Sequence, residues 1–344
     1  MDYVHDVRLV SELDLPWDKF NGKTIAISGA TGMIGKCLIE VLLCKNMQFR
    51  IVAFGRNIEK AKARLNGAFG DKRFSFVEID INNEAPAVES ADFVLHLAST
   101  THPLQYASDP VGTISANVLG LKNMLDMAVR TRVERFLFAS SVEVYGENRG
   151  DIEEFDEKYC GYIDCNTLRA GYPEGKRVGE ALCQAYLAQE KISIVVPRLA
   201  RVFGPTMLAD DSKASSQFIR NAVNAEDIIL KSDGMQYYSY LYVVDAVSGI
   251  LHVLLNGENG EAYNVCDERF NIHLKDFAGI AANVAKTKVI FQLPSEGEKE
   301  GFSKATKAIM SSKKIKKLGF DVSEGIEDRI EETIREIKKR SNER

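Results

Sequence analysis

The chain has 344 residues, of which 45% are hydrophobic and 27% are charged, and its formal net charge is −5. This composition is ordinary for a soluble globular protein, and the length allows two domains or one large α/β unit. The acidic balance argues against nucleic acid as a partner, because phosphate binding requires a clustered basic face. We interpret the one basic run, at 313–317, as a solvated helix face.

The six cysteines form no C-x-x-C pair, and no histidine stands at metal-ligand spacing from them. We therefore expect reduced thiols and no metal site. The chain opens on no signal peptide, and no apolar run reaches the roughly 18 residues of a membrane span. These features predict a cytoplasmic protein without membrane partners.

Apolar runs alternate with amphipathic segments after a short helical extension at 1–21. The predicted strands are 24–30, 49–55, 74–81, 92–99, 135–141 and 193–200, and the predicted helices are 33–45, 58–69, 111–131 and 174–190. Continuous β-branched strands separated by helices predict a parallel sheet covered on both faces. The expected fold over 22–204 is therefore a Rossmann-type doubly wound α/β domain, with ligands at the carboxyl ends of its strands.

The alternation of strands and long helices ends after residue 204, where loops, short helices and an aromatic strand follow one another. We predict a smaller C-terminal α/β domain formed by 205–238 and 258–344. The segment between them, about 239–257, is expected to return to the first domain.

The stretch "ISGATGMIG" places Gly29, Gly32 and Gly35 directly after a strand and at the start of a helix. In this context Gly29 permits a tight turn, Gly32 lets backbone N–H groups approach a pyrophosphate, and Gly35 lets the helix pack closely. The helix N-terminus adds partial positive charge. The turn therefore predicts a dinucleotide cofactor.

The end of the second strand indicates which dinucleotide is bound. It carries Arg56 and no acidic residue, and an arginine there suits the 2′-phosphate of NADP, whereas an acid suits the ribose of NAD. We therefore favour NADP over NAD. The other residues predicted to contact the cofactor lie in the turn or near later strand ends: Thr31, Met33, Ile34, Asp80, Ile81, Leu97, Ala98, Ser99, Asn117, Ser140, Tyr172, Lys176 and Pro197.

Ser141 and Tyr172 both follow strands at the expected cofactor edge, and Lys176 lies one helical turn beyond Tyr172. A phenol with an ordinary pKa near ~10 is a poor base at neutral pH. We expect Lys176 and an oxidised nicotinamide to lower the pKa of Tyr172. Tyr172 would then remove a hydroxyl proton while the adjacent C–H delivers hydride. Ser141 would bind the same oxygen, and Lys176 would also anchor the nicotinamide ribose.

These stretches together resemble the extended short-chain dehydrogenase/reductase family, specifically its nucleotide-sugar epimerase/dehydratase branch. The resemblance covers nearly the whole chain after residue 22 and includes "GATGMIG", "HLAS", "NVLGLKNML", "SSVEVYG", "YPEGKR", "RVFGP" and "YVVDAVSG". The pattern is most similar to that of UDP-glucuronate decarboxylases. It implies a nucleoside-diphosphate sugar as substrate, bound by the smaller domain. It also implies a homodimer formed through the helices around 111–130 and 176–190.

Two departures from the resemblance bear on the reaction. Decarboxylases of this type carry a substrate-binding arginine where this chain has Tyr238, which argues against decarboxylation. The 4,6-dehydratases have an acidic pair where this chain has Val142 and Glu143, which argues against elimination of water. Glu143 is expected either as a second acid/base, alongside Tyr172, Lys176 and Ser141, or as a partner of the backbone.

Arg201 stands where relatives have asparagine, and it either binds the diphosphate or forms a buried ion pair. The predicted substrate-binding residues are Thr100, Ser141, Glu143, Arg201, Gln217 and Tyr238.

The leading prediction is an NAD(P)-dependent 4-epimerase of a nucleoside-diphosphate sugar. An NADPH-dependent 4-keto-sugar reductase is the first alternative, followed by a UDP-glucuronate decarboxylase or a 4,6-dehydratase. A dinucleotide-binding sensor without chemistry is the least favoured, because it has no need for the Tyr172–Lys176 pair.

Overall fold

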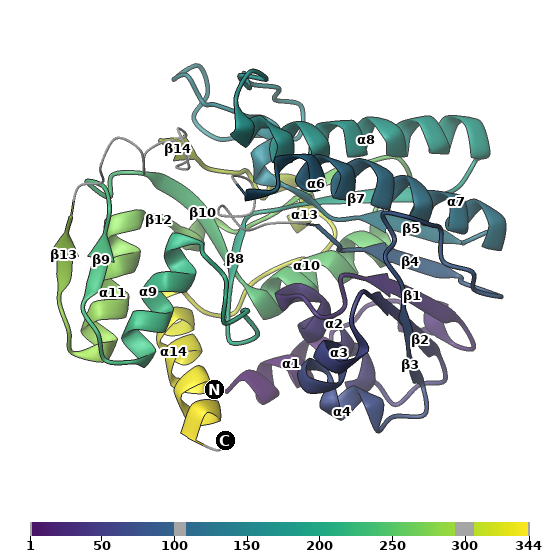
Figure 1. The fold of residues 1–344 in the computed structure, drawn as a ribbon, viewed down its shortest axis with the longest axis horizontal. Helices are drawn as coiled ribbons and strands as arrows, with labels where there is room; N and C mark the ends of the chain where they lie inside the picture. Colours follow the sequence, from purple (N-terminus) through teal and green to yellow (C-terminus); the bar gives the residue numbers. More distant parts are fainter. Residues whose placement is uncertain (1, 100–107, 293–305, 343–344) are drawn as a thin grey trace.

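The computed structural model describes residues 2–99, 108–292 and 306–342 of the chain (Figure 1). A large parallel sheet occupies one side of the molecule. Its strands are β1 (Thr24–Ser28), β2 (Arg50–Gly55), β3 (Phe74–Glu78), β4 (Phe93–His96), β5 (Arg135–Phe138), β6 (Ser140–Ser141), β7 (Ile194–Leu199) and β11 (Ala262–Val265). Their order is β3-β2-β1-β4-β5-β7-β11, with the short β6 beside β7, and every pairing is parallel. The predicted doubly wound Rossmann-type fold is confirmed.

Helices cover both faces of this sheet (Figure 1). On one side lie α2 (Met33–Cys44) and α10 (Val243–Asn256), and on the other lie α7 (Leu121–Thr131) and α8 (Gly171–Glu190). Successive side chains of β1 point to opposite faces of the sheet. Ile25 and Ile27 pack in one hydrophobic cluster, and Ala26 packs in the other. The central strands are therefore buried on both faces, which is why their sequences are continuously apolar.

Two helices differ from their predicted form. The predicted helix at 111–131 is divided into α6 (Pro110–Ser115), a π-helical turn η2 (Ala116–Gly120) and α7. Such turns interrupt the regular hydrogen-bond ladder and are frequent at functional sites. Helix α8 begins at Gly171 rather than at 174, so Pro173 lies in its first turn, where a missing N–H removes no intrahelical bond.

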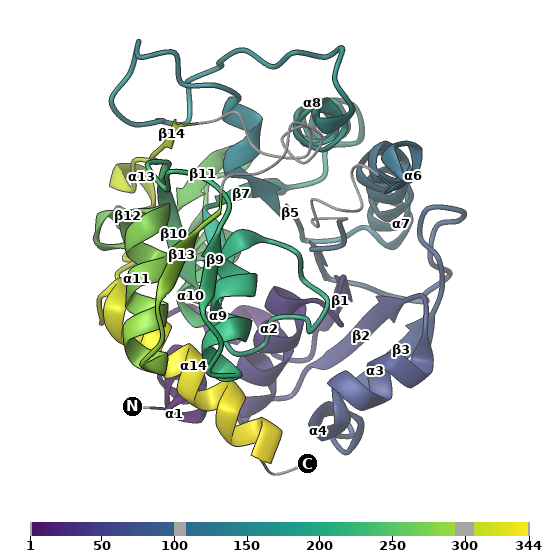
Figure 2. The same cartoon turned by 60° about the vertical axis from the view of Figure 1, so that its left-hand side comes forward.

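A smaller unit lies on the other side of the molecule (Figures 1 and 2). Its central strand β10 (Tyr237–Tyr242) pairs with β8 (Arg201–Phe203), β12 (Asn271–His273) and β14 (Lys307–Ala308). The other elements of this part of the chain are α9 (Ala214–Val223), β9 (Ile228–Leu230), α11 (Leu274–Ala285), β13 (Val289–Phe291), α13 (Lys313–Lys316) and α14 (Ile326–Asn342). Strands β9 and β13 form a separate parallel pair.

The sheets depart from the predicted domain boundaries in two places. Strand β11, inside the range assigned to the second domain, pairs with β7 and completes the large sheet. Strand β8, inside the range assigned to the first domain, pairs with β10 of the smaller sheet. Helix α10 packs against α2 and β7, whereas residues 239–242, which also lie in the segment expected to return, belong to β10 of the smaller sheet.

The N-terminal extension contains α1 (Tyr3–Ser11) and a single 3₁₀ turn, η1 (Trp17–Phe20). Helix α1 packs on α2 and α10, and its Asp6 pairs at 2.5 Å with the buried Arg329 of α14. The two ends of the chain are therefore joined by a buried ion pair. Within the described ranges, none of the helices combines the length and apolar character needed to cross a membrane.

Four more short elements are α3 (Ile58–Arg64), α4 (Asn66–Phe69), and the 3₁₀ turns η3 (Val142–Tyr145) and η4 (Leu168–Ala170). A further 3₁₀ turn, η5 (Glu268–Phe270), precedes β12. Turns η3 and η4 lie directly after β6 and directly before α8, so they frame the carboxyl edge of the large sheet.

Candidate active site

The glycine turn joins β1 to α2 in a conformation that requires two of its three glycines. Gly29 has a φ of +73°, and a Cβ there would lie 2.6 Å from the backbone nitrogen of Ala98. A Cβ on Gly35 would lie 2.3 Å from the carbonyl oxygen of Gly29. Since real side chains do not tolerate these separations, Gly29 and Gly35 are fixed by the packing of the turn itself.

Gly32 is less crowded than the other two glycines. A Cβ added there would meet only the carbonyl oxygen of Gly29 among the described residues, at 3.1 Å. Gly32 is the N-cap of the twelve-residue helix α2, and it offers no side chain to the first backbone N–H groups. Space above Gly32 and unbonded N–H groups at a helix N-terminus are what a pyrophosphate requires. The residues present therefore fit a dinucleotide, with Thr31, Met33 and Ile34 forming the rest of the turn.

Arg64 of α3 holds this turn against the loop that follows β8, a feature the sequence analysis missed. Its Nε donates to the Thr31 carbonyl oxygen at 3.2 Å, and its Nη2 donates to that of Thr206 at 2.6 Å. The Thr206 hydroxyl in turn donates to the Met33 carbonyl oxygen at 2.9 Å. The sequence around Arg64 is typical of a solvent-exposed helix, so it did not predict this role. The partners of Arg64 are backbone carbonyl oxygens that lie far away in the sequence.

The predicted cofactor contacts at the strand ends lie along one edge of the sheet. Arg56 is exposed just after β2, and Asp80 and Ile81 follow the end of β3 by a few residues. Leu97, Ala98 and Ser99 follow β4 directly.

Two other predicted cofactor residues lie within the sheet and make structural contacts. Ser140 of β6 donates to Glu180 at 2.6 Å, and Glu180 is also paired with Arg198. Pro197 lies inside β7, opposite Tyr263 of β11.

Tyr172, Ser141 and Lys176 are brought together at this edge. The hydroxyls of Ser141 and Ser99 both act on the Tyr172 phenol as hydrogen-bonding groups that lower its pKa. The Lys176 Nζ lies 5.9 Å from the centre of the Tyr172 ring and donates to the Ala139 carbonyl oxygen at 2.8 Å. Tyr172 and Lys176 are 7% and 3% exposed, so the group is assembled in a largely dry environment.

The predicted lowering of the Tyr172 pKa is not seen in this structure. Burial raises the pKa of Tyr172 to about 12, and the hydrogen bonds from Ser141 and Ser99 only partly oppose it. Burial also lowers the pKa of Lys176 to about 7, which weakens the cation that was expected to stabilise the phenolate. Desolvation therefore dominates both groups, because each is removed from water without a full counter-charge.

Glu143 lies between two arginines beside Tyr172. Its carboxylate accepts from Arg169 Nη2 and from Arg201 Nη2, each at 3.1 Å. Burial alone would raise the pKa of Glu143, but Arg169 and Arg201 lower it overall. The side chain is therefore an ionised carboxylate in a cluster whose formal charges sum to +1. The role of Arg169 was not predicted, because its partner Glu143 lies 26 residues earlier in the chain.

Arg201 is engaged in an ion pair, yet its bonding is incomplete. Its Nη1 atom is buried without a hydrogen-bond partner among the described residues. Its guanidinium lies 3.7 Å from the centre of the buried Tyr238 ring on the adjacent strand. Tyr238 therefore belongs to the same cluster as Glu143.

Gln217, another predicted substrate residue, does not join this cluster. Gln217 is exposed on α9, and its amide donates to the Ser212 carbonyl oxygen at 2.7 Å. Thr100 lies outside the described residues.

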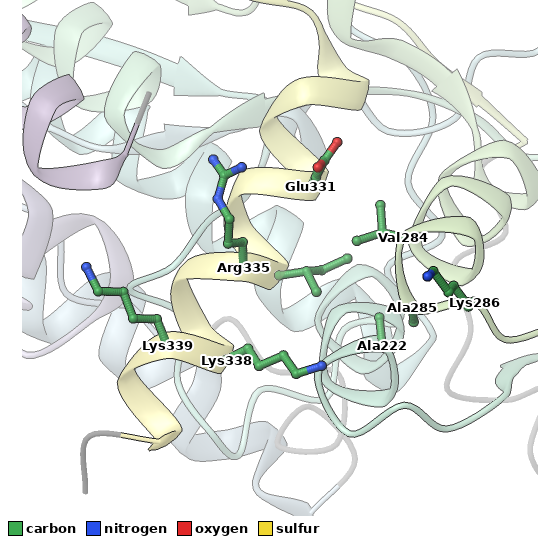
Figure 3. A pocket seen from close by; sticks show the side chains of 9 residues that line it. Ala222, Val284, Ala285, Lys286, Glu331, Arg335, Lys338 and Lys339 are labelled. Atoms are coloured by element: carbon green, nitrogen blue, oxygen red, sulfur yellow. The ribbon is translucent and has the colours of Figure 1, made fainter.

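A separate hollow of about 400 Å³ lies between α9, α11 and α14 (Figure 3). Lys286, Arg335, Lys338 and Lys339 line it together with apolar residues such as Val284. None of the predicted site residues is among its lining, so this hollow is distinct from the Tyr172 group.

The glycine turn and the Ser141–Tyr172–Lys176 group define a Rossmann-fold enzyme that binds a nicotinamide dinucleotide. The family model described as the NAD dependent epimerase/dehydratase family matches residues 25–266, and the chain belongs to this family. UDP-glucuronic acid decarboxylase 3 of Arabidopsis thaliana is 34% identical over 236 residues, which are 69% of this chain and 67% of that protein. UDP-glucuronic acid decarboxylase 1 of Xenopus tropicalis is 32% identical over 71% of this chain and 56% of its own length. The predicted family and enzyme class are confirmed, which removes the sensor alternative.

Solved structures share the fold at lower identity. A dTDP-glucose 4,6-dehydratase from Streptomyces venezuelae, solved with NAD bound, superposes with a TM-score of 0.80 and 20% identity, covering 93% of this chain and 98% of its own. A UDP-glucuronic acid 4-epimerase from Bacillus cereus, solved with UDP-glucuronic acid and NAD, gives 0.78 and 21%, covering 92% of this chain and 99% of its own. These likenesses confirm the fold.

Proposed function

We propose that this protein is a 4-epimerase of a nucleoside-diphosphate sugar. The observation that carries the proposal is that Tyr172, Ser141 and the buried Lys176 meet at the sheet edge that holds the glycine turn. The Lys176 Nζ lies 5.9 Å from the centre of the Tyr172 ring, and the Ser141 hydroxyl lowers the pKa of the phenol. Oxidation and reduction at C4 require only these side chains and a dinucleotide. Glu143 is ionised between two arginines, so it is not available as the general acid that elimination of water requires.

In this reaction Tyr172 removes the proton of the C4 hydroxyl, and Ser141 binds the same oxygen. A bound oxidised nicotinamide supplies the hydride acceptor at C4 and a positive charge that favours the phenolate. Lys176 uses one N–H on the Ala139 carbonyl oxygen, and its other donors face the ribose hydroxyls in this proposal. After the keto-sugar has turned its other face, C4 regains the hydride and Tyr172 returns the proton to the oxygen, so the product has the mass of the substrate.

A uronic acid decarboxylase is a second candidate, and one observation favours it. Its decarboxylating relatives carry an arginine at the place of Tyr238, and here the Arg201 guanidinium stacks on that tyrosine from the neighbouring strand. The guanidinium of Arg201 therefore lies close to Tyr238, the position at which the decarboxylases carry their substrate-binding arginine. Oxidation at C4 of a uronic sugar would give a β-keto acid, which loses carbon dioxide readily.

One experiment separates these reactions. The protein is incubated with UDP-, dTDP-, GDP- and CDP-linked sugars and uronic acids, with and without NADPH, and the products are weighed by mass spectrometry. Unchanged mass with an altered sugar supports the epimerase, loss of carbon dioxide supports the decarboxylase, and a gain of two hydrogens supports a reductase. Loss of water would overturn the assignment of Glu143.

We also propose NADP as the preferred cofactor and a homodimer as the assembly. Arg56 is exposed at the end of β2, where it could meet a 2′-phosphate. The outer faces of α6, η2 and α8 expose apolar side chains, including Val111, Ile114, Leu119 and Val178. Helices α6 and α8 pack against each other, so these side chains lie on one helical layer that a second copy could cover.

A further inference from the structure

Arg64 is a cation that binds the backbone of the glycine turn. It is the last residue of α3 and is half-buried. Its guanidinium donates to the carbonyl oxygens of Thr31 at 3.2 Å, Thr206 at 2.6 Å and Met207 at 3.5 Å. In the described part of the chain, no carboxylate forms an ion pair with Arg64. Because arginine keeps its proton in proteins, a full positive charge lies against the turn with carbonyl oxygens as its described partners.

Lys36, the cation in the first turn of α2, is placed differently. Its Nζ pairs with Glu40 at 2.6 Å and donates to the Arg64 carbonyl oxygen at 3.0 Å. Glu40 also accepts from the Tyr3 hydroxyl. Asp210, a second acid whose charge acts on Arg64, is exposed to solvent. The charge of Lys36 is therefore neutralised by contact with an acid, whereas that of Arg64 is not.

The bond to the Thr31 carbonyl oxygen fixes one peptide unit of the turn. A trans peptide places its carbonyl oxygen and the next N–H on opposite sides of one plane. Arg64 therefore sets the direction of the Gly32 N–H, which donates to the Gly29 carbonyl oxygen at 3.0 Å and closes the turn. The stretch "GATGMIG" contains no basic side chain of its own. A pyrophosphate at this turn would therefore receive its nearest fixed cation from α3.

We propose that Arg64 is a positioning residue for the dinucleotide. It holds the peptide between Thr31 and Gly32 in place, and its charge favours the pyrophosphate through the turn. A bound anion would also compensate a half-buried charge that is costly to leave unpaired. No proton or electron is transferred in this role. The inference rests on the dinucleotide of the proposed function and deepens it.

The proposal predicts a loss of affinity that NAD and NADP share. Both dinucleotides contain the pyrophosphate, whereas the 2′-phosphate expected to meet Arg56 is present only in NADP. Arg64→Gln removes the charge and most of the donors, so the Kd of both dinucleotides should rise by a similar factor. We expect about fivefold or more, the effect of losing one ordinary hydrogen bond. Arg64→Lys keeps the charge and one carbonyl bond, and it should lose less.

Salt separates an effect of charge from a loss of structure. Because screening weakens interactions between charges, the loss caused by Arg64→Gln should shrink between about 0.05 and 0.5 M salt. Arg135 provides the matched control. It is also half-buried and donates to the carbonyl oxygens of Leu254 at 3.1 Å and Gly257 at 2.8 Å, but it begins β5, at the opposite edge of the sheet. Arg135→Gln should lower the melting temperature and leave both Kd values unchanged.

The measurement is titration calorimetry of the full chain with NAD and with NADP at both salt concentrations. An unchanged Kd in Arg64→Gln would overturn the proposal, and so would a loss that is independent of salt or equally large in Arg135→Gln. If Arg64→Gln does not fold, Arg64→Lys still decides. Affinity close to that of the unsubstituted chain supports the role of charge, and a loss as large as that predicted for Arg64→Gln would contradict it.

Failure of the proposed function would appear separately. In that case the affinities would follow the predicted pattern, while the sugar product would have lost carbon dioxide or water.

Discussion

The guanidinium of Arg201 lies 3.7 Å from the centre of the Tyr238 ring while its Nη2 donates to the Glu143 carboxylate at 3.1 Å. The sequence left two roles open for Arg201, diphosphate binding or a buried ion pair, and the structure shows the ion pair. The same side chain keeps one buried nitrogen unbonded within the described residues. Arg201 therefore both holds Glu143 ionised and retains capacity to bind an anion.

Replacing Arg201 should make stability less dependent on pH. Because the folded-state pKa of Glu143 lies below its ordinary value, the pair stabilises the fold above the unfolded pKa, and that stabilisation is lost as pH falls through the folded pKa. We expect Arg201→Gln to lower the melting temperature more at pH 7 than at pH 3. Lys307→Gln, which breaks an exposed pair with Glu153, is the control and should change little at either pH. An equal loss at both pH values would contradict the account.

Gly175 should be intolerant of a methyl group. A Cβ there would lie 3.0 Å from the Cβ of the buried Asn117, so α8 could not approach the π-helical turn as closely. We expect Gly175→Ala to destabilise the protein by about 1–3 kcal/mol through overpacking and to lower kcat. Gly279→Ala in α11, where nothing described lies within 4 Å, should instead stabilise by about 0.5–1 kcal/mol. Urea unfolding of both variants checks this, and equal stability of the two would be inconsistent with the packing described.

The sequence was sufficient for the fold and for the placing of Tyr172, Ser141 and Lys176 at one edge of the sheet, because these depend on local patterns. Short stretches of sequence are enough to show the periodicity of strands and helices and the spacing of the glycines. The same is true of the four-residue interval between Tyr172 and Lys176. The cluster around Glu143 was not predictable, since Arg169 and Arg201 meet it from separate segments. The raised pKa that burial gives Tyr172 in the protein alone was not predictable for a related reason, because desolvation depends on total burial. The π-helical turn at Asn117 likewise has no periodic signature.

Arg56 should decide the choice of dinucleotide. If its guanidinium meets a 2′-phosphate, Arg56→Ala should weaken NADP binding about tenfold or more and leave NAD binding nearly unchanged. Lys60→Ala, an exposed cation on the following helix, is the matched control. Titration calorimetry with both dinucleotides gives the answer, and an unsubstituted chain that prefers NAD would end the proposal of NADP preference.

The exposed apolar face of α8 should mediate self-association. Val178 is 46% exposed on this helix, and a charge there would be buried without a partner in a dimer. We expect a dimer by light scattering at micromolar concentration and a monomer for Val178→Glu. Val4→Glu, which alters a valine that is 60% exposed on α1, should leave the dimer intact. A monomeric unsubstituted chain would refute the proposed assembly.

The most direct test of the central claim is the turnover of a nucleotide sugar that carries deuterium at C4. If Tyr172 acts as the base while C4 delivers hydride, the unsubstituted enzyme should show a primary isotope effect and return the deuterium to C4 of an epimerised product of unchanged mass. Tyr172→Phe should lose at least about a thousandfold in kcat with substrate binding retained, within the range of general-base catalysis. Turnover without an isotope effect, or at an unchanged rate in Tyr172→Phe, would contradict oxidation at C4 by this site.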